Sequence, residues 1–321
     1  MIINIFIAFI LDLFIGDPPL SVHPVRLIGR LLDFLEDWLY PVSRKFVGGL
    51  LLVVVALFIV LGVTAGLWYV MFLFTLPLGI NVVMVGLLFF LFCNRDMVRE
   101  AKKVYLFLEQ GKVEQARVQV GRIVGRDTEG LGRVEIVRAA VESVSENIVD
   151  GFTAPLFYLT LGGVPLAYAY KTANTVDSRI GYRNERYEQF GKAGARLDDA
   201  LNFIPARLNA FFLFCATGFR REVLHTMLRD GRKHPSPNSG IAEAGFAGYL
   251  GIALGGPSRY GGTVREKPWI GENRIDGEEL EDPRLILRAV ALYWRVVAVT
   301  LIAFLAALSL LRLPLLFAFR G

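Results

Sequence analysis

The chain has few of the residues on which covalent catalysis and zinc binding depend. It contains two cysteines, Cys93 and Cys215, and three histidines, His23, His225 and His234. The two cysteines both lie in apolar stretches, which excludes a disulfide framework and a cysteine-based zinc site. So few histidines argue against a nucleophilic triad. The sequence also lacks a P-loop and the HExxH and GxSxG motifs, which excludes the enzyme classes built on them.

Charge is missing altogether from one long segment. Residues 47–93 contain no Asp, Glu, Lys, Arg or His. Because one membrane span needs about 20 apolar residues, this segment predicts a hairpin of two transmembrane helices with its tip near Pro77. Two further apolar segments predict a short membrane segment at 1–16 and a last span at 293–311.

Elsewhere the charge is concentrated in loops. The chain of 321 residues is 54% hydrophobic and 20% charged, with a net charge of +5. It is too apolar for most soluble domains and too charged for a bare membrane bundle. We therefore expect a single all-α, multi-pass integral membrane domain with cytoplasmic helices at 94–150, the last beginning near Asp127, and soluble loops at 220–288.

The positive charge bears on partners and orientation. No basic run or nucleic-acid motif is present, so the charge suits membrane lipid or anionic substrates rather than nucleic acid. Ten Lys and Arg residues lie between Arg95 and Arg138, four more precede the hairpin, and its tip has none. The positive-inside rule places both flanking loops in the cytoplasm. This predicts a protein of the cytoplasmic membrane whose active site faces the cytoplasm.

Two apolar segments at 151–219 are too interrupted for ordinary spans. Prolines and the pair Gly162-Gly163 break residues 151–170, and Pro205 and Arg207 interrupt residues 200–219. Either both segments cross the membrane and their connecting loop lies outside, or both are re-entrant or interfacial. We favour the second arrangement, because broken helices at membrane depth occur where they are buried or line a cavity.

A stripe of carboxylates precedes these segments. Glu142, Glu146 and Asp150 are spaced i, i+4, i+8, so on one α-helix they share a face, and like charges at that spacing repel. In one interpretation the stripe is an exposed face paired with Arg133 and Arg138. In the other it binds a hard cation such as Mg²⁺, which takes several oxygen ligands. The carboxamide beside Glu146 favours the metal site.

Several other polar residues also have a structural alternative. His23 follows a proline turn and is either structural or functional. Glu243 is either a site residue or a first-turn acid that favours the helix dipole. The pair 198–199 is either catalytic or a helix start, and Arg207 either binds phosphate or snorkels.

Five segments in a fixed order resemble a known family. Together they span most of the chain, from Gly16 to about Glu272, and resemble the adenosylcobinamide-phosphate synthases, the CobD/CbiB family of cobalamin biosynthesis. The segments are GDPPLSVHPVRLIG (16–29), ESVSENIVDGFTAPLFY (142–158), GGVPLAYAYKTANTVDS (162–178), FGKAGARLDDALNFIPARL (190–208) and HPSPNSGIAEAGFAGYLGIALGG (234–256).

The resemblance implies a membrane ligase. Such an enzyme joins adenosylcobyric acid to (R)-1-aminopropan-2-ol O-phosphate, or to free aminopropanol, in an ATP-dependent reaction with Mg²⁺. ATP would activate the carboxylate as an acyl phosphate or an acyl adenylate, and the neutral amine would then attack. Other enzymes of the corrinoid pathway are expected partners.

The candidate site residues fall into groups by chemistry. Magnesium and the ATP phosphates are assigned to Glu142, Glu146 and Asp150. Asp177, Asp198 and Asp199 complete that site or bind the amine. Phosphate groups are assigned to Lys171, Arg179, Arg183 and Arg207, and corrin amides to Asn147, Asn174, Asn202 and Asn238. His234 is the candidate base, and His23 and Glu243 are further ligand-binding candidates.

Two other functions remain open from the sequence. A transporter is compatible with polar residues near broken apolar segments, but it predicts an inverted repeat, and the sequence shows none. A corrinoid-binding carrier or scaffold without ligase activity is the other alternative. Binding of Mg-ATP together with a corrinoid would distinguish a ligase from a scaffold.

Overall fold

Helices dominate the computed structural model of the chain. It describes residues 1–18, 20, 22–73, 80–182, 184–271 and 278–318. About 73% of the chain is helical with almost no sheet, which confirms the all-α prediction. The chain forms two compact units. Unit 1 comprises residues 1–93, 150–202 and 303–321, and unit 2 comprises 94–149 and 203–302.

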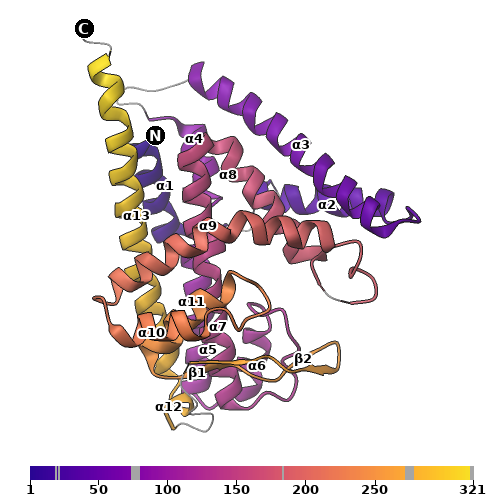
Figure 1. The fold of residues 1–321 in the computed structure, drawn as a ribbon, viewed down its shortest axis with the longest axis vertical. Coiled ribbons are helices and arrows are strands. Elements are labelled where there is room, and N and C mark those ends of the chain that lie inside the picture. The colour runs from indigo at the N-terminus through magenta and orange to yellow at the C-terminus, as the bar shows by residue number, and fades with distance from the viewer. Residues whose placement is uncertain (19, 21, 74–79, 183, 272–277, 319–321) are drawn as a thin grey trace. The chain divides into compact units, whose positions relative to one another are not determined.

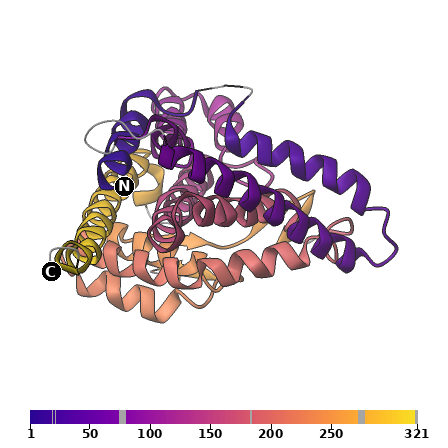
Figure 2. The same ribbon diagram turned by 90° about the horizontal axis from the view of Figure 1, so that it is seen from above.

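Unit 1 contains the most apolar helices. Within it α3 packs beside α2 and α8, and α1 packs beside α4 (Figures 1 and 2). Its helices are α1 (Ile2–Ile15), α2 (Pro24–Leu39), α3 (Lys45–Leu73), α4 (Val82–Phe89), α8 (Ala154–Ile180), the first part of α9 (Lys192–Ala216) and the last part of α13 (Arg284–Ala318).

Helix α8 is broken where the sequence predicts it. Gly162 and Gly163 have non-helical backbone angles, and Pro165 follows two residues later. Gly163 has φ of 68°, a conformation that suits glycine. A Cβ atom there would lie 1.6 Å from the ring of Trp68 on α3, so glycine also permits the close approach of the two helices.

The predicted hairpin at 47–93 has only one long helix among the described residues. Helix α3 extends over 29 residues, but α4 has only eight, which rise about 12 Å against the roughly 30 Å of a bilayer core. The side chain of Asn81 accepts a hydrogen bond from Met84 N–H and so begins α4 late. The second arm is therefore shorter than predicted; its predicted tip at Pro77 lies outside the described residues.

Unit 2 is built around α7. This helix packs against α5, α6, α11 and β1. The unit also contains two small antiparallel strand pairs, β1 with β4 and β2 with β3. Its elements are α5 (Asn94–Glu109), α6 (Val113–Val120), α7 (Arg133–Ile148), α10 (Arg221–Asp230), α11 (Ser239–Leu250), β1 (Ala253–Gly255), β2 (Ser258–Tyr260), β3 (Thr263–Arg265), β4 (Trp269–Gly271), α12 (Glu278–Glu281) and the adjoining parts of α9 and α13.

Helix α7 begins later than its sequence predicts. Its expected start near Asp127 is wrong, because the Asp127 carboxylate accepts the N–H of Gly262 and Asp127 N–H donates to Arg259 C=O. These bonds tie residue 127 to the β2–β3 hairpin. The helix begins instead at Arg133, where Gly132 N–H donates to the carboxylate of Glu135, a side-chain cap of the helix start.

The membrane character of the sequence is matched by the helices. In the described part of the chain, three helical stretches are long and apolar enough to cross a membrane: Lys45–Met71, Arg133–Ile180 and Arg284–Leu310. Helix α1 is apolar but shorter.

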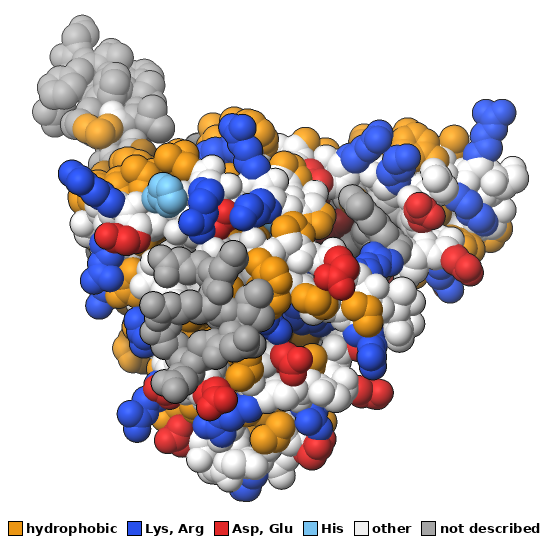
Figure 3. All heavy atoms as spheres, turned by 60° about the horizontal axis from the view of Figure 1, so that its bottom comes forward, with side chains coloured by type: hydrophobic (Ala, Val, Ile, Leu, Met, Phe, Trp, Pro, Cys, Tyr) orange, Lys and Arg blue, Asp and Glu red, His pale blue; other side chains and the backbone are white. Residues whose placement is uncertain are grey.

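On the face drawn in Figure 3, Lys and Arg side chains are interspersed with acidic and hydrophobic ones rather than forming one basic band.

Candidate active site

The first candidate residue on α7, Glu142, is an ion-pair partner. Its Oε2 lies 2.7 Å from Nη2 of Arg126, and its Oε1 accepts the N–H of Gly255 at 2.6 Å. The two side chains of the ion pair are 8% and 10% exposed. The alternative in which the stripe pairs with Arg133 and Arg138 is therefore wrong for Glu142, and both of its oxygens are already engaged.

One turn further along α7, Glu146 meets residues from two other segments. Ligand atoms of Glu146, His234 and Glu243 lie within 4.8 Å of one another, so this trio could hold a metal ion. Helix α11 begins at Ser239, so Glu243 lies beyond its first turn and the alternative of a first-turn acid is wrong. Glu243 is also only 2% exposed. Burial, followed by the charge of Glu146, raises the pKa of Glu243 well above its ordinary value. Glu243 therefore holds a proton more tightly than an ordinary carboxyl.

The hydrogen bonds of His234 fix its tautomer. Its Nδ1 accepts the N–H of Ser236 at 3.1 Å, and its Nε2 lies 3.6 Å from Glu243 Oε1. A neutral ring that accepts at Nδ1 carries its proton on Nε2. Burial also lowers the pKa of His234, so the ring is neutral near pH 7. The Nε2–H faces Glu243 but forms no hydrogen bond with a described residue, and either metal binding or base catalysis at Nε2 requires this proton to move.

A small pocket opens beside this trio. It has a volume of about 80 Å³, and its walls include Arg126, Glu142, Ser143, Glu146 and Lys267. The two carboxylates lie on α7, Arg126 lies in the loop before α7, and Lys267 lies between β3 and β4. A pocket with paired charges of both signs suits a phosphate group with its counter-ion.

The third carboxylate of the stripe has different partners. Residues Val149–Thr153 form a π-helix, which breaks the α-helical register before Asp150 is reached. Asp150 lies in unit 1, where its Oδ1 accepts the Tyr170 hydroxyl at 3.2 Å and its C=O lies 3.4 Å from Lys171 Nζ. Although Glu142, Glu146 and Asp150 are spaced i, i+4, i+8, Asp150 therefore does not share the partners of the other two carboxylates.

A second polar cluster in unit 1 surrounds Asp198 on α9. Its Oδ1 accepts from Asn174 Nδ2 at 3.3 Å and its Oδ2 from Asn202 Nδ2 at 3.0 Å. Burial, and then the charges of Asp150 and Asp177, raise the pKa of Asp198 to about 8. Asp198 is therefore largely protonated at neutral pH. Helix α9 begins at Lys192 and has no acid in its first turn, so the alternative of a helix-start pair at 198–199 is wrong.

Two further carboxylates and one lysine belong to this cluster. Asp177 is near enough to Asp150 and Asp199 to experience their charge. Lys171 Nζ donates to the Asn174 side chain at 3.2 Å. The cluster thus combines several acids with one lysine, an arrangement that attracts a cation such as a metal ion or a substrate ammonium group.

The remaining candidates have separate partners. Arg207 donates to Asn238 Oδ1 at 2.7 Å and its guanidinium stacks 3.6 Å from the Phe203 ring, so it is not merely snorkelling. Asn147 donates to Ser143 C=O on its own helix. Arg179 forms an ion pair with Asp33. His23 Nε2 lies 3.0 Å from the Asp17 carboxylate, and its Nδ1 caps the start of α2. Arg183 lies outside the described residues.

Sequence reasoning missed several residues of these clusters. Arg126, Tyr260 and Lys267 line the small pocket of unit 2, and Tyr170 joins the network of unit 1. Arg126 follows Gly125 and precedes Asp127 in a polar loop, a position that offered a weak signal. The others have no local signal, because their role depends on contacts with distant segments.

Comparison with known proteins identifies the family of this chain. The family model described as CobD/Cbib protein matches residues 5–293. This chain belongs to the CobD/CbiB family. That confirms the resemblance carried by the five segments, and none of the solved structures compared matches the chain.

Curated relatives of the family match over most of their length. The Cobalamin biosynthesis protein CobD of Clostridium perfringens is 41% identical, with 92% of this chain and 96% of the relative covered. The CbiB protein of Salmonella typhi is 42% identical, with 94% and 95% covered. The CobD protein of Geobacter metallireducens is 45% identical, with 83% and 85% covered.

Proposed function

We propose that this protein is an acid–amine ligase of cobalamin biosynthesis. It joins adenosylcobyric acid to (R)-1-aminopropan-2-ol O-phosphate, or to aminopropanol, with ATP and Mg²⁺, and produces adenosylcobinamide phosphate or the corresponding cobinamide. The observation that carries the proposal is membership of the CobD/CbiB family over residues 5–293. The names of the relatives support a role in cobalamin biosynthesis.

The chemistry available in unit 2 suits the phosphates and the magnesium ion. Glu146 is the carboxylate of the stripe that fits Mg²⁺, because it lines the small pocket and is not engaged by an arginine. Glu142 fits less well, since both of its oxygens already accept hydrogen bonds. When bound, magnesium would neutralise phosphate charge during activation of the substrate carboxylate. Arg126 and Lys267 provide positive charge in the same pocket.

The chemistry available in unit 1 suits the amine. The amino alcohol carries an ammonium group near neutral pH, and the acids around Asp198 favour a cation. The amine attacks only after it has lost a proton, so a base with a pKa near neutrality is useful. Asp198, whose pKa is raised to about 8, is the proposed proton acceptor in its ionised form, a minority at neutral pH that grows as the pH rises. Asp177 and Asp199 hold the ammonium group, and Asn174 and Asn202 also offer amide hydrogen bonds to the corrin side chains.

The proposal also includes where the enzyme lies in the cell. The apolar helices anchor the enzyme in the cytoplasmic membrane, and the excess of Lys and Arg between residues 95 and 138 favours a cytoplasmic active site. Membrane attachment would keep a scarce corrinoid close to neighbouring enzymes of its pathway.

A direct ligation assay tests the function. Purified full-length protein in nanodiscs receives adenosylcobyric acid, aminopropanol phosphate, ATP and magnesium, and mass spectrometry detects the corrinoid and nucleotide products. We expect the amide product, with ADP if the carboxylate is activated as an acyl phosphate and AMP if it is activated as an adenylate. Absence of an amide from folded protein that still binds the corrinoid would refute the ligase and favour a carrier.

Two variants connect the assay to the two units. Glu146→Ala should lower kcat, because it removes the proposed magnesium ligand, and Asp199→Ala should raise KM for the amine. Each loss should be about tenfold or more, the effect of removing one charged contact. Glu109→Ala, at an exposed position at the end of α5, is the matched control. Full ligation rates in both site variants would show that the residue assignment is wrong.

A further inference from the structure

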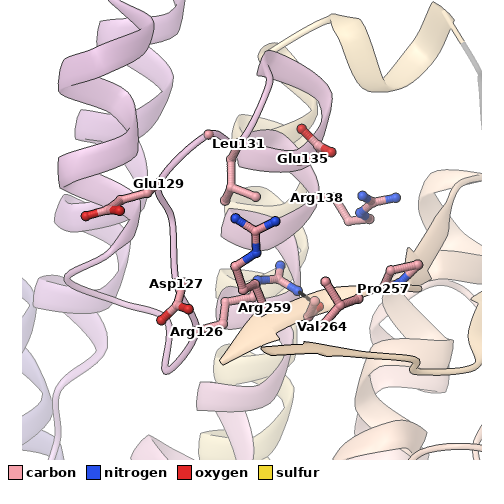
Figure 4. A pocket seen from close by; sticks show the side chains of 11 residues that line it. Arg126, Asp127, Glu129, Leu131, Glu135, Arg138, Pro257, Arg259 and Val264 are labelled. Carbon is pink, nitrogen blue, oxygen red and sulfur yellow. Dashed lines mark hydrogen bonds between the residues drawn. The ribbon is translucent and has the colours of Figure 1, made fainter. Parts of the chain in front are cut away.

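An arginine-lined pocket in unit 2 lies next to the small pocket but is much larger. Its volume is about 380 Å³, within the range of small-molecule sites. Its walls come from the loop before α7, from α7 itself and from the β2–β3 hairpin (Figure 4). Three arginines, Arg126, Arg138 and Arg259, line it. None of the candidate ligand residues expected from the sequence does so.

Three acids, Asp127, Glu129 and Glu135, also line the pocket. Asp127 accepts the N–H of Gly262 at 2.7 Å, and Glu135 accepts the N–H of Gly132. Each of these carboxylates therefore accepts a backbone N–H with one of its two oxygens. In Figure 4 the side chain of Glu129 extends away from the centre of the pocket. The three acids equal the three arginines in formal charge, but among the described residues none of them forms an ion pair with an arginine of the pocket.

Arg126 has a buried donor that no described group satisfies. Its Nη1 donates to Ser258 Oγ at 2.7 Å and its Nη2 to Glu142 at 2.7 Å. The side chain is only 8% exposed, yet its Nε has no hydrogen-bond partner among the described residues. A buried N–H without an acceptor costs about 1–3 kcal/mol, so such a group is expected to meet a ligand.

The other two arginines, unlike Arg126, form no ion pair with a described carboxylate, although the charges of Glu142 and Glu135 act on Arg138 from a greater distance. Arg138 is 8% exposed and lies 4.8 Å from the ring of Trp269, and Arg259 is exposed on β2. Within the described part of the chain, neither has an acidic group at ion-pair distance. Their planar guanidinium groups remain available for an anion, and such groups match phosphate oxygens in geometry and charge.

We propose that this pocket binds the phosphate group of a phosphate ester through Arg126, Arg138 and Arg259. The inference rests on the proposed function for the identity of the ester, which is ATP or the amino-alcohol phosphate. Arg126 lines both this pocket and the small pocket that contains Glu146. A phosphate held here therefore lies next to the carboxylate proposed to bind magnesium.

Binding measurements with matched variants test the pocket. Full-length protein in nanodiscs is titrated calorimetrically with Mg-ATP, with aminopropanol phosphate, with free aminopropanol and with inorganic phosphate. Arg259→Gln changes an exposed side chain and should fold normally, Arg138→Gln changes a buried one, and Arg122→Gln is an exposed control outside the pocket. Thermal unfolding of each variant verifies its fold.

The separate titrations distinguish ATP from the amino-alcohol phosphate as the ester that binds in the pocket. For one ester, Arg259→Gln should weaken binding about tenfold, the effect of losing one charge-assisted hydrogen bond, while the control leaves it unchanged. The ester that responds identifies the occupant, and binding of free aminopropanol should not respond. Unchanged affinity for both esters in folded Arg259→Gln and Arg138→Gln would overturn the proposal.

The outcome is independent of the ligase assay. Ligation with an unchanged KM for ATP and for the amine phosphate in both variants would reject the pocket and leave the proposed function standing. Arginine-dependent phosphate binding by a protein that forms no amide would support the pocket and reject the ligase.

Discussion

The ion pair between Arg126 and Glu142 should contribute measurably to the stability of unit 2. The two charges are 2.7 Å apart, and the side chains are 8% and 10% exposed. Breaking a buried pair by removing one partner costs about 3–5 kcal/mol, because the other charge stays buried. Glu142 keeps the N–H of Gly255, so Arg126→Gln should fall near the lower end, at about 3 kcal/mol.

A double-mutant cycle isolates the pair from other effects. Glu142→Gln retains an acceptor for Gly255 N–H but loses the charge that faces Arg126. The double variant should be less destabilised than the sum of the two single variants. The expected coupling is about 2 kcal/mol, within the range for contacting residues.

Thermal unfolding of the full-length protein in nanodiscs, followed by tryptophan fluorescence, provides the assay. For a cooperative unit of about 150–250 residues, each kcal/mol shifts Tm by roughly 2–4 °C. Arg126→Gln should therefore lower Tm by about 6–12 °C, and Arg122→Gln, at an exposed loop position, should leave it almost unchanged. Strict additivity of the two single variants would refute the buried pair and, with it, the wall shared by the two pockets.

Three further changes should have distinct effects on stability. Because burial and then Glu146 raise the pKa of Glu243, the folded protein keeps a proton that the unfolded chain releases above about pH 4.3. Stability from the neutral carboxyl should fall as pH rises from there through the folded pKa. Glu243→Gln should reduce this fall in Tm, and identical pH slopes would contradict the reasoning. Asp230 is fully buried and accepts hydrogen bonds from the side chains of Arg229 and Lys233 and from the N–H of Gly271. Asp230→Asn should therefore lower the free energy of unfolding by about 2–3 kcal/mol, measured by thermal unfolding. An unchanged Tm would show that the carboxylate is solvated. Gly163→Ala should cost about 2–4 kcal/mol through strain and overlap with Trp68. Trp68→Ala in the same chain should recover part of that loss in Tm, and no recovery would show that the two residues are not in contact.

Local sequence patterns predicted most of the helical architecture. The uncharged residues 47–93 predicted apolar helices, and Gly162-Gly163 predicted the break in α8, because length, hydrophobicity and glycine act over a few residues. The length of α4 was not predicted, since it depends on the cap made by Asn81. The strands between Ala253 and Gly271 were missed as well, because three-residue strands resemble turns until they pair.

Part of the candidate site could be named from the sequence but not assembled. Glu146, His234 and Glu243 were each singled out, yet only the fold brings them within 4.8 Å. The regular spacing of the stripe favoured Asp150 as a partner of Glu146. The π-helix at Val149–Thr153 changes that register, and a local deviation of this kind has no strong sequence signal.

The sequence by itself determined the family, the membrane character and the residue types available for chemistry. These properties are recorded in ordered motifs, in apolar length and in composition. The tertiary structure alone decided which charges meet: Arg126 with Glu142, Asp198 with two asparagines, and three arginines around one pocket. The physical reason is that burial and electrostatic contact depend on distances between segments far apart in the chain, which periodicity and composition do not encode.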